Sequence, residues 1–141
     1  MVNVDELAFL TAYQPDRKLR ERLNAVLPLL LTQGRAVGVC VVAAVQDPRK
    51  EIVSFRSLFP VRVALRLDEP SQVDLVLGDG ALDRGAACHL IGADEATGAG
   101  IGYVVVEGDA YPRRVRAGWV TDPDIHAMAT EYPAPRAGAT T

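Results

Sequence analysis

The first part of the chain predicts a strand followed by a helix. Residues 1–4 form a short run compatible with a strand, and the Asp5-Glu6 pair follows it directly. From Asp16 onward, leucine and valine recur at three- and four-residue spacing with charged residues on the other faces, which predicts an amphipathic helix. Gly34 is expected to end that helix. Pro28 removes one helical hydrogen bond, at a cost of roughly 3 kcal/mol, so we expect a kink or a break there.

A second strand is predicted over residues 37–45. These residues are apolar on both alternating faces, which is the pattern of a central parallel strand that helices cover on each side. The run ends at Gln46, just before Asp47-Pro48. Residues 49–58 are compatible with a short helix, and residues 61–65 alternate enough to predict a third strand.

The second half of the chain predicts smaller elements. They are a helix from Pro70 with Ser71 and Asp74 as its start signal, a mobile glycine-rich loop over 92–102, a hairpin-like pair over 102–106 and 113–117, and a last helix that Asp122-Pro123 caps and that runs through Met128. From Tyr132 onward the sequence has too little apolar content to pack. We therefore expect one domain over residues 1–131 and a disordered tail over 132–141.

Composition and charge restrict the class of protein. At 141 residues, with 49% hydrophobic and 23% charged residues, the chain has the size and make-up of one soluble domain. Its net charge of −3 lacks the basic footprint of a small nucleic-acid-binding protein, so any contact with DNA has to be local. No apolar run approaches the roughly 20 residues of a membrane-spanning helix, and the acidic start is unlike a secretory signal. The expected location is therefore the cytoplasm.

The cysteines and histidines give no sign of a metal site. Cys40, Cys88, His89 and His126 show neither metal-ligand spacing nor a disulfide framework. Strands that alternate with helices predict instead an open α/β sheet, in which function lies at the carboxyl ends of parallel strands. The Asp5-Glu6 pair and Gln46 occupy such ends.

An apolar strand followed by Asp-Glu has the form of a Walker B motif. In that motif the aspartate, here Asp5, holds Mg²⁺ through water, and the glutamate, here Glu6, polarises the water that attacks the γ-phosphate of ATP. Gln46, at the end of the next buried strand, is placed to sense that phosphate. The residues alone leave plainer alternatives open: a solvated strand end for the two carboxylates and a polar turn for Gln46.

Taken together, these residues resemble successive blocks of the FtsK/SpoIIIE family of DNA translocase motors. The matching blocks are Val4-Asp5-Glu6, Gly34–Gly38, Ala43–Arg49, Phe59–Ala64, Asp74–Ala81, Val115-Arg116 and Val120–Asp122. The resemblance covers nearly all of residues 1–129 and is greatest to motors of actinobacterial conjugative elements. It implies a RecA-like P-loop NTPase motor fold, C-terminal half only, with a mostly parallel sheet, flanking helices and a C-terminal β-hairpin. It also implies a hexameric ATPase ring that moves double-stranded DNA in conjugation or chromosome partition.

The resemblance also implies roles for single residues. Asp5 would be the Mg²⁺-linked aspartate, Glu6 the general base or water-positioning acid, and Gln46 the sensor, so that all three face the ATP. Arg62 matches the arginine of the Pro-Thr-Arg block of the family. It would act near phosphate or across the subunit interface, or else pair with a carboxylate as a structural residue. Arg66 is an alternative for the same role.

Basic residues after the two predicted strands are candidate DNA contacts. Channel-facing loops would present Arg17, Lys18, Arg49 and Lys50 to phosphates without reading bases. A solvated helix face and loop is an equally good interpretation of the same residues.

The phosphate-binding loop is the part of the family pattern that this sequence lacks. The motif G-x-x-x-x-G-K-[ST] is absent, and neither Lys18 nor Lys50 follows a glycine. We therefore expect a motor truncated before its Walker B strand, inactive alone, which binds ATP and Mg²⁺ only when a Walker A half is supplied. Loss of the neighbouring strand is expected to leave apolar surface and an unpaired sheet edge.

The expected partners follow from the same comparison. They are double-stranded DNA and either a hexameric ring of like subunits or the N-terminal half of the motor, in a translocase whose intact form is compatible with a membrane anchor. Two alternatives stay open: a non-catalytic partner that docks onto an intact ring and regulates it, and an unrelated small α/β ligand-binding domain.

Overall fold

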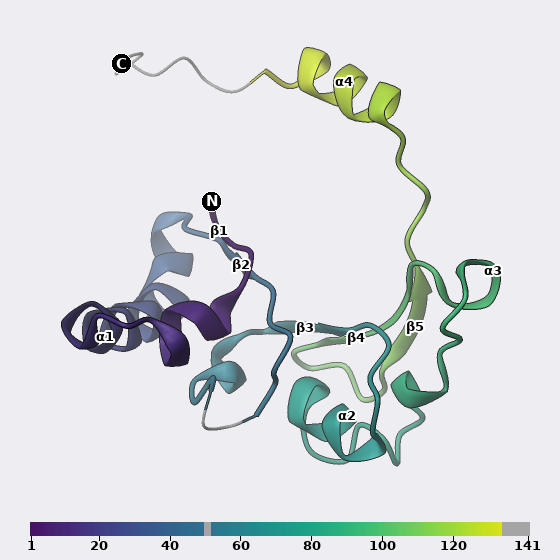
Figure 1. Cartoon of the computed structure of the whole chain (residues 1–141), viewed down its shortest axis with the longest axis horizontal. Helices are drawn as coiled ribbons and strands as arrows, with labels where there is room; N and C mark the ends of the chain where they lie inside the picture. The colour runs from purple at the N-terminus through teal and green to yellow at the C-terminus, as the bar shows by residue number, and fades with distance from the viewer. Residues whose placement is uncertain (50–51, 134–141) are drawn as a thin grey trace.

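The computed structural model describes residues 1–49 and 52–133, which form two small sheets and four α-helices (Figure 1). The first sheet is a parallel pair of β1 (Val2–Val4) and β2 (Val41–Ala43). The second is antiparallel, in the order β3 (Val61–Ala64), β4 (Ile101–Val106) and β5 (Arg113–Arg116). The predicted α/β class and the hairpin are confirmed. The prediction of a mostly parallel sheet is wrong for the described residues, because β3 pairs antiparallel with the later hairpin. The pattern of a single strand does not fix the direction of its partner.

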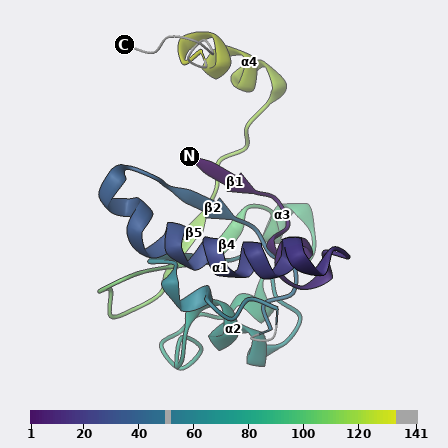
Figure 2. The same ribbon diagram turned by 90° about the vertical axis from the view of Figure 1, so that its left-hand side faces the viewer.

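A helical crossover connects the two parallel strands. A π-helical turn (Phe9–Tyr13) and α1 (Arg17–Gln33) lead from β1 to β2, and the register places Val4 opposite Ala43. Parallel neighbours need such a crossover, since a tight turn can only reverse the chain. Figure 2 shows α1 lying across one side of this pair.

Helix α1 begins and ends as predicted. The Asp16 side chain accepts two backbone N–H groups of the first turn, at 2.9 and 3.1 Å, and so caps the helix. Gly34 follows the last helical residue as the C-cap. The helix continues through Pro28, so the predicted break does not occur. One lost hydrogen bond is tolerated because the neighbouring turn packs Leu27 into the core.

Two segments are less regular than predicted. Of the strand expected over 37–45, the first residue belongs to a 3₁₀ turn (Gly34–Val37), and Gly38 follows with φ of +75°, a conformation that glycine adopts readily. Of the helix expected over 49–58, the described part contains a 3₁₀ turn at Arg56–Leu58. The first correction shortens the strand to Val41–Ala43, and the second puts a 3₁₀ turn in the described part of the expected helix.

Each sheet has its own hydrophobic core. The first core consists of Leu7, Leu27, Val53 and Phe55. The second consists of Ala64, Val73, Leu77, Ala81, Ala86, Cys88, Ile91, Ile101, Tyr103 and Val105. Helix α2 (Pro70–Leu77) contributes two fully buried side chains to the second core and thereby covers the antiparallel sheet. Burial of such aliphatic side chains provides most of the stability of a small domain.

The start of α2 is capped differently from the prediction. The Gln72 side chain accepts the Glu69 N–H at 3.2 Å, so these two residues form the cap and Ser71 does not. The Asp74 carboxylate instead accepts the backbone N–H groups of Gly80 and Leu82, at 3.1 and 2.9 Å. Its carboxylate therefore orders the turn after the helix.

The C-terminal part departs from the rest of the molecule. A short helix, α3 (Glu95–Gly98), lies within the predicted mobile loop. Helix α4 (Asp122–Glu131) stands apart from both cores with all its side chains exposed (Figures 1 and 2). Its cap is Thr121, one residue earlier than predicted. The Thr121 hydroxyl accepts the Asp124 N–H, and the Asp124 carboxylate accepts the Thr121 N–H. Residues 134–141 of the expected tail lie outside the described residues, and the domain bounds stay a prediction.

In the described part of the chain, no helix has both the length and the apolar character that a membrane span requires.

Candidate functional site

Parallel pairing brings the ends of β1 and β2 to one edge of the sheet. Val4 lies opposite Ala43, and the Ala44 N–H donates to the Val4 carbonyl at 2.9 Å. The Leu7 N–H then donates to the Ala44 carbonyl at 2.8 Å, beyond the last residue of either strand. The segment that carries the Asp5-Glu6 pair is thus hydrogen-bonded to the segment that leads to Gln46.

The two carboxylates at this edge have different surroundings. Asp5 is exposed to solvent at the end of β1. Glu6 is half-buried, and its Oε1 accepts the Ala8 N–H at 3.0 Å, so it caps the helical segment that begins at Leu7. A carboxylate that accepts one N–H keeps further lone pairs, so Glu6 can cap the helix and still bind a water molecule.

An ion pair fixes the turn that follows Gln46. Arg49 Nε donates to both carboxylate oxygens of Asp47, at 2.8 and 2.9 Å, and the Tyr13 hydroxyl donates at 3.4 Å. The Arg49 guanidinium holds the pKa of Asp47 below its ordinary value, and the carboxylate in turn raises the pKa of Arg49. The Gln46 side chain is exposed beside this turn.

The carboxylates at the strand ends suit a Mg²⁺ ion that is also coordinated by phosphate oxygens. Across residues 1–49 and 52–133, no three or more His, Cys, Asp and Glu side chains group closely enough to hold a metal ion. This edge of the sheet therefore offers a metal ion two neighbouring carboxylates, those of Asp5 and Glu6. Mg²⁺ commonly takes one or two protein carboxylates and completes its shell with water and phosphate oxygens. These residues suit an ion that arrives with a nucleotide.

Arg62 belongs to the other sheet and lies at the C-terminal end of α2. A Cβ placed on Gly78, the residue after that helix, would stand 2.9 Å from Arg62 Nη1. The guanidinium is thus positioned at the negative end of the helix dipole. Arg66 is more exposed and lies 3.7 Å from the Asp68 carboxylate. Neither arginine comes from the edge that holds the Asp5-Glu6 pair.

The predicted DNA-contacting residues differ in how freely they can meet phosphate. Arg17 pairs with Glu21 at 2.7 Å on the exposed face of α1, and Arg49 is engaged by Asp47. Lys18 is exposed on the first turn of α1. Lys50 lies outside the described residues.

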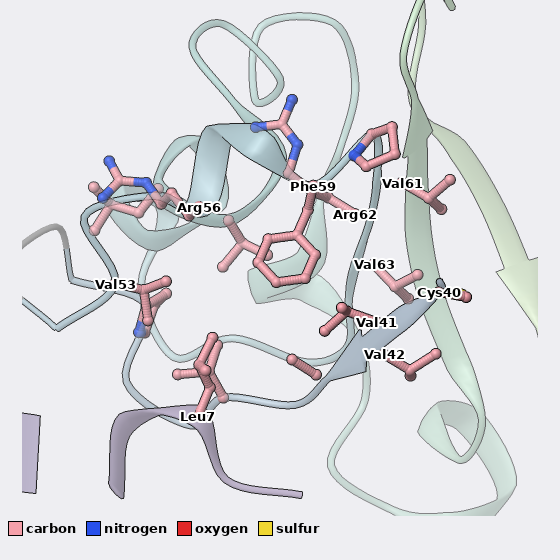
Figure 3. A pocket seen from close by; sticks show the side chains of 16 residues that line it. Leu7, Cys40, Val41, Val42, Val53, Arg56, Phe59, Val61, Arg62 and Val63 are labelled. Carbon is pink, nitrogen blue, oxygen red and sulfur yellow. The ribbon is translucent and has the colours of Figure 1, made fainter. Parts of the chain in front are cut away.

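Sequence reasoning did not locate an apolar cleft of about 400 Å³ that lies between β2 and β3. Its walls come from both sheets and from the segment that connects them (Figure 3). They include Cys40, Val41, Val42, Ala43, Phe59, Val61, Arg62, Val63 and Val76. The Phe59 ring points into the space between the two sheets. The sequence signal for the cleft is that residues 37–45 are apolar on both faces, whereas among the described residues β2 has a strand on one side.

Comparison with known proteins supports the fold. The sequence matches no family model and no curated protein. The structure is similar to that of the pCW3 conjugation coupling protein TcpA, in its monomer form with ATPγS, with a TM-score of 0.67 and 21% sequence identity. The match covers 86% of this chain and 33% of that chain, so the described fold spans about a third of the length of the coupling protein. At this identity the likeness establishes a shared fold.

Proposed function

We propose that this chain is part of an ATP-driven translocase of double-stranded DNA of the FtsK/SpoIIIE type, and that it supplies the Walker B half of the nucleotide site. The observation that carries the proposal is the fold match over 86% of the chain to a conjugation coupling protein whose structure was determined with ATPγS. Residues outside this sequence would supply the remainder of the motor, including the phosphate-binding loop.

The edge formed by β1 and β2 supports the proposal. Asp5 is the exposed carboxylate that would hold Mg²⁺ through water, and the ion would neutralise charge on the phosphate oxygens of ATP. Glu6 would position the attacking water, since the Ala8 N–H fixes one of its oxygens and so orients the other. Gln46 follows the neighbouring strand, where its amide can donate to the γ-phosphate and release it on hydrolysis.

The ring and its DNA channel belong to the same proposal. A nucleotide held between subunits needs a cationic donor from the neighbouring copy, and Arg62 and Arg66 are the candidates. Arg66 has the more exposed side chain, at 51%, and only a loose partner in Asp68. Double-stranded DNA would pass through a cytoplasmic hexameric ring of like subunits, or of this chain assembled with the N-terminal half.

Reconstitution of hydrolysis tests the proposal. The genomic sequence upstream of the Met1 codon is searched for an in-frame G-x-x-x-x-G-K-[ST] motif after an apolar strand, and the encoded half is expressed separately. We expect the mixture, and neither half alone, to hydrolyse ATP in a DNA-stimulated manner. Glu6→Gln should abolish this activity, whereas Glu107→Gln, an exposed change in the β4-β5 turn, should leave it intact.

One observation favours a second candidate, a non-catalytic partner that docks onto an intact ring. Glu6 caps the helical segment through the Ala8 N–H, and this contact alone gives the acidic residue a structural reason to be present. In that case the mixture would show no hydrolysis of its own. The chain would instead bind a complete translocase ring and change the rate of hydrolysis by that ring, and Glu6→Gln would leave both effects unaltered.

A further inference from the structure

The outer strand of the antiparallel sheet leaves one backbone edge unpaired. In the part of the chain that the structure describes, β5 pairs with β4 alone and forms the end of its sheet (Figure 1). The Ala117 N–H donates to the Gly100 carbonyl at 2.9 Å, so every second residue before Ala117 bonds to β4. The N–H and C=O groups of the residues between them, Arg114 and Arg116, therefore point away from the sheet.

The side chains of these two arginines lie on the face of the sheet that covers the second core. Arg114 is opposite Tyr103 and Arg116 is opposite Ile101, and both of these β4 residues are buried. Directly opposed residues of an antiparallel pair share one face of the sheet. The arginines are nevertheless exposed, since β5 lies at the rim of that core. A row of unpaired backbone groups and two guanidinium groups therefore lie along the same edge.

A polar hollow of about 390 Å³ adjoins the Arg114 side chain. Its walls come from β4, from β5 and from the segment around α3, and they include Leu90, Ile91, Thr97, Tyr103 and Arg114. A side chain of an added strand that enters this hollow would meet the Arg114 guanidinium. A carboxylate is the group that a guanidinium binds through two parallel N–H donors. The hollow therefore suits an acidic side chain.

The charges along this edge indicate an acidic occupant. Among the described residues neither Arg114 nor Arg116 forms an ion pair. Arg116 donates to the Ala99 and Ala96 carbonyls at 3.1 and 3.0 Å, which positions its guanidinium and leaves the charge uncompensated. Carboxylates on an added strand would neutralise both arginines. The phosphates of a nucleic acid would neutralise them too, but phosphate oxygens only accept hydrogen bonds and would leave the backbone carbonyls of the edge unpaired.

We propose that β5 is a docking edge for an extended acidic segment of another protein, which adds to the antiparallel sheet as a further strand. Residues opposite Arg114 and Arg116 share the face of these arginines, so the segment carries acidic side chains at two alternate positions. The residue between them lies beside Val115, which is 40% exposed, and is therefore apolar and β-branched. This surface belongs to the sheet that does not carry the Asp5-Glu6 pair, and the inference goes beyond the proposed function.

Amide hydrogen exchange of the full chain, followed by NMR, measures the pairing at single residues. The probe is a labelled synthetic peptide with the central sequence threonine-glutamate-valine-glutamate-threonine, and fluorescence anisotropy gives its Kd. At ten times its Kd this peptide should slow exchange of the Arg114 and Arg116 amides about tenfold, because only about a tenth of the chain stays open. The Val115 amide already bonds to β4, so its exchange should change less. This alternation is the signature of an added strand.

Two matched peptides separate strand pairing from simple attraction of charges. One has lysine in place of both glutamates, and the other keeps the glutamates but has its alternate backbone amides N-methylated, so neither should protect the edge. Equal protection by either control, or no protection by the glutamate peptide at its highest soluble concentration, overturns the docking edge. Alternating protection that appears with a short DNA duplex, or with rising concentration of the chain alone, also overturns it, because nucleic acid or a second copy would then be the occupant.

A substitution in the chain tests the role of the charge. Arg114→Gln removes one guanidinium and keeps the backbone edge, so the glutamate peptide should bind about two- to fivefold more weakly, the effect of one cross-strand charge pair. Arg22→Gln is the matched control, because Arg22 is exposed on α1, and it should leave the affinity unchanged. Equal affinity of Arg114→Gln and the native chain overturns the recognition of acidic side chains.

The peptides and the substitution decide independently of each other and of the proposed function. If Arg114→Gln does not fold, the three peptides still decide on the native chain. The assay needs neither ATP nor the second half of the motor. Failed reconstitution of hydrolysis with alternating protection intact therefore refutes the proposed function alone, and restored hydrolysis without protection refutes the docking edge alone.

Discussion

The Arg62 guanidinium lies against Gly78, at the point where α2 ends. A Cβ on Gly78 would stand 2.9 Å from Arg62 Nη1, closer than two such atoms can approach. Gly78 also has φ of +103°, a conformation that side chains with a Cβ rarely adopt. The backbone conformation therefore requires glycine here, and a Cβ would in addition displace the Arg62 guanidinium. The contact also fixes Arg62 in a wall of the cleft.

Gly78→Ala should destabilise the second core by about 1–3 kcal/mol, the usual cost of forcing a side chain into a conformation reserved for glycine. Urea unfolding monitored by circular dichroism measures the change in free energy. Gly118→Ala is the matched control, because a Cβ at that position meets nothing within 4 Å. Equal stability of the two variants would show that Gly78 has no such constraint.

Local signals explain what the sequence predicted correctly. Asp16 and Gly34 mark the ends of α1 because a cap and a stop act on backbone groups one to four residues away. The common edge at which β1 and β2 end followed from one further rule, that parallel strands with a helical crossover end on the same side.

Non-local choices explain what the sequence did not predict. The direction of β3 depends on β4, whose paired residues come 39 to 45 positions later, and no pattern within residues 61–65 encodes it. The cap of α2 depends on whether Gln72 or Asp74 binds the N–H groups at the helix start. Gln72 does so, because the Asp74 carboxylate accepts N–H groups of the turn after the helix. The cleft was not predicted because it lies between two sheets, and sequence patterns describe single elements.

The Asp47-Arg49 pair gives a pH-dependent prediction. The pKa of Asp47 is depressed in the folded chain because Arg49 donates to its carboxylate. A depressed pKa adds stability above the unfolded value of about 3.9, and that stability is lost as pH falls through the folded value. In Arg49→Gln the pKa of Asp47, followed by carbon NMR of its carboxyl, should rise toward about 3.9.

The same variant should unfold more easily than the native chain at neutral pH, and the difference should vanish in acid. Arg17→Gln is the control, because it breaks a different exposed ion pair, the one between Arg17 and Glu21 within α1. It should leave the Asp47 titration unchanged. An Asp47 titration that is the same in Arg49→Gln and in the native chain would contradict the pairing.

DNA binding by the reconstituted motor should depend more on Lys18 than on Arg49. The Lys18 side chain is exposed, whereas the charge of Arg49 is offset by Asp47. Removing one cationic side chain from a DNA phosphate lowers the slope of log affinity against log salt by about 0.9. Lys18→Ala should therefore reduce that slope by about 0.9, and Arg49→Ala should reduce it by less.

Fluorescence anisotropy with labelled duplex DNA at several salt concentrations gives both slopes. Lys18→Arg keeps the charge and should keep the native slope. A native slope in Lys18→Ala would exclude this residue as a phosphate-binding group and leave it as part of a solvated helix face.

Glu6 combines a structural and a proposed catalytic role that two substitutions can separate. Its Oε1 accepts the Ala8 N–H at 3.0 Å, and an amide oxygen can accept the same bond. Glu6→Gln should therefore keep the cap and change the free energy of unfolding by less than about 0.5 kcal/mol. Glu6→Ala removes the acceptor and should cost about 0.5–2 kcal/mol, as for other caps.

Hydrolysis by the reconstituted motor should respond differently from stability. Both substitutions remove the carboxylate that would position the attacking water, so both should abolish DNA-stimulated hydrolysis, although only Glu6→Ala weakens the fold. If Glu6→Gln retained full hydrolysis, Glu6 would be a capping residue alone and the water would have to be positioned by another group. A parallel loss of stability and activity in Glu6→Gln would contradict the cap geometry, because the amide oxygen would then fail to replace the carboxylate.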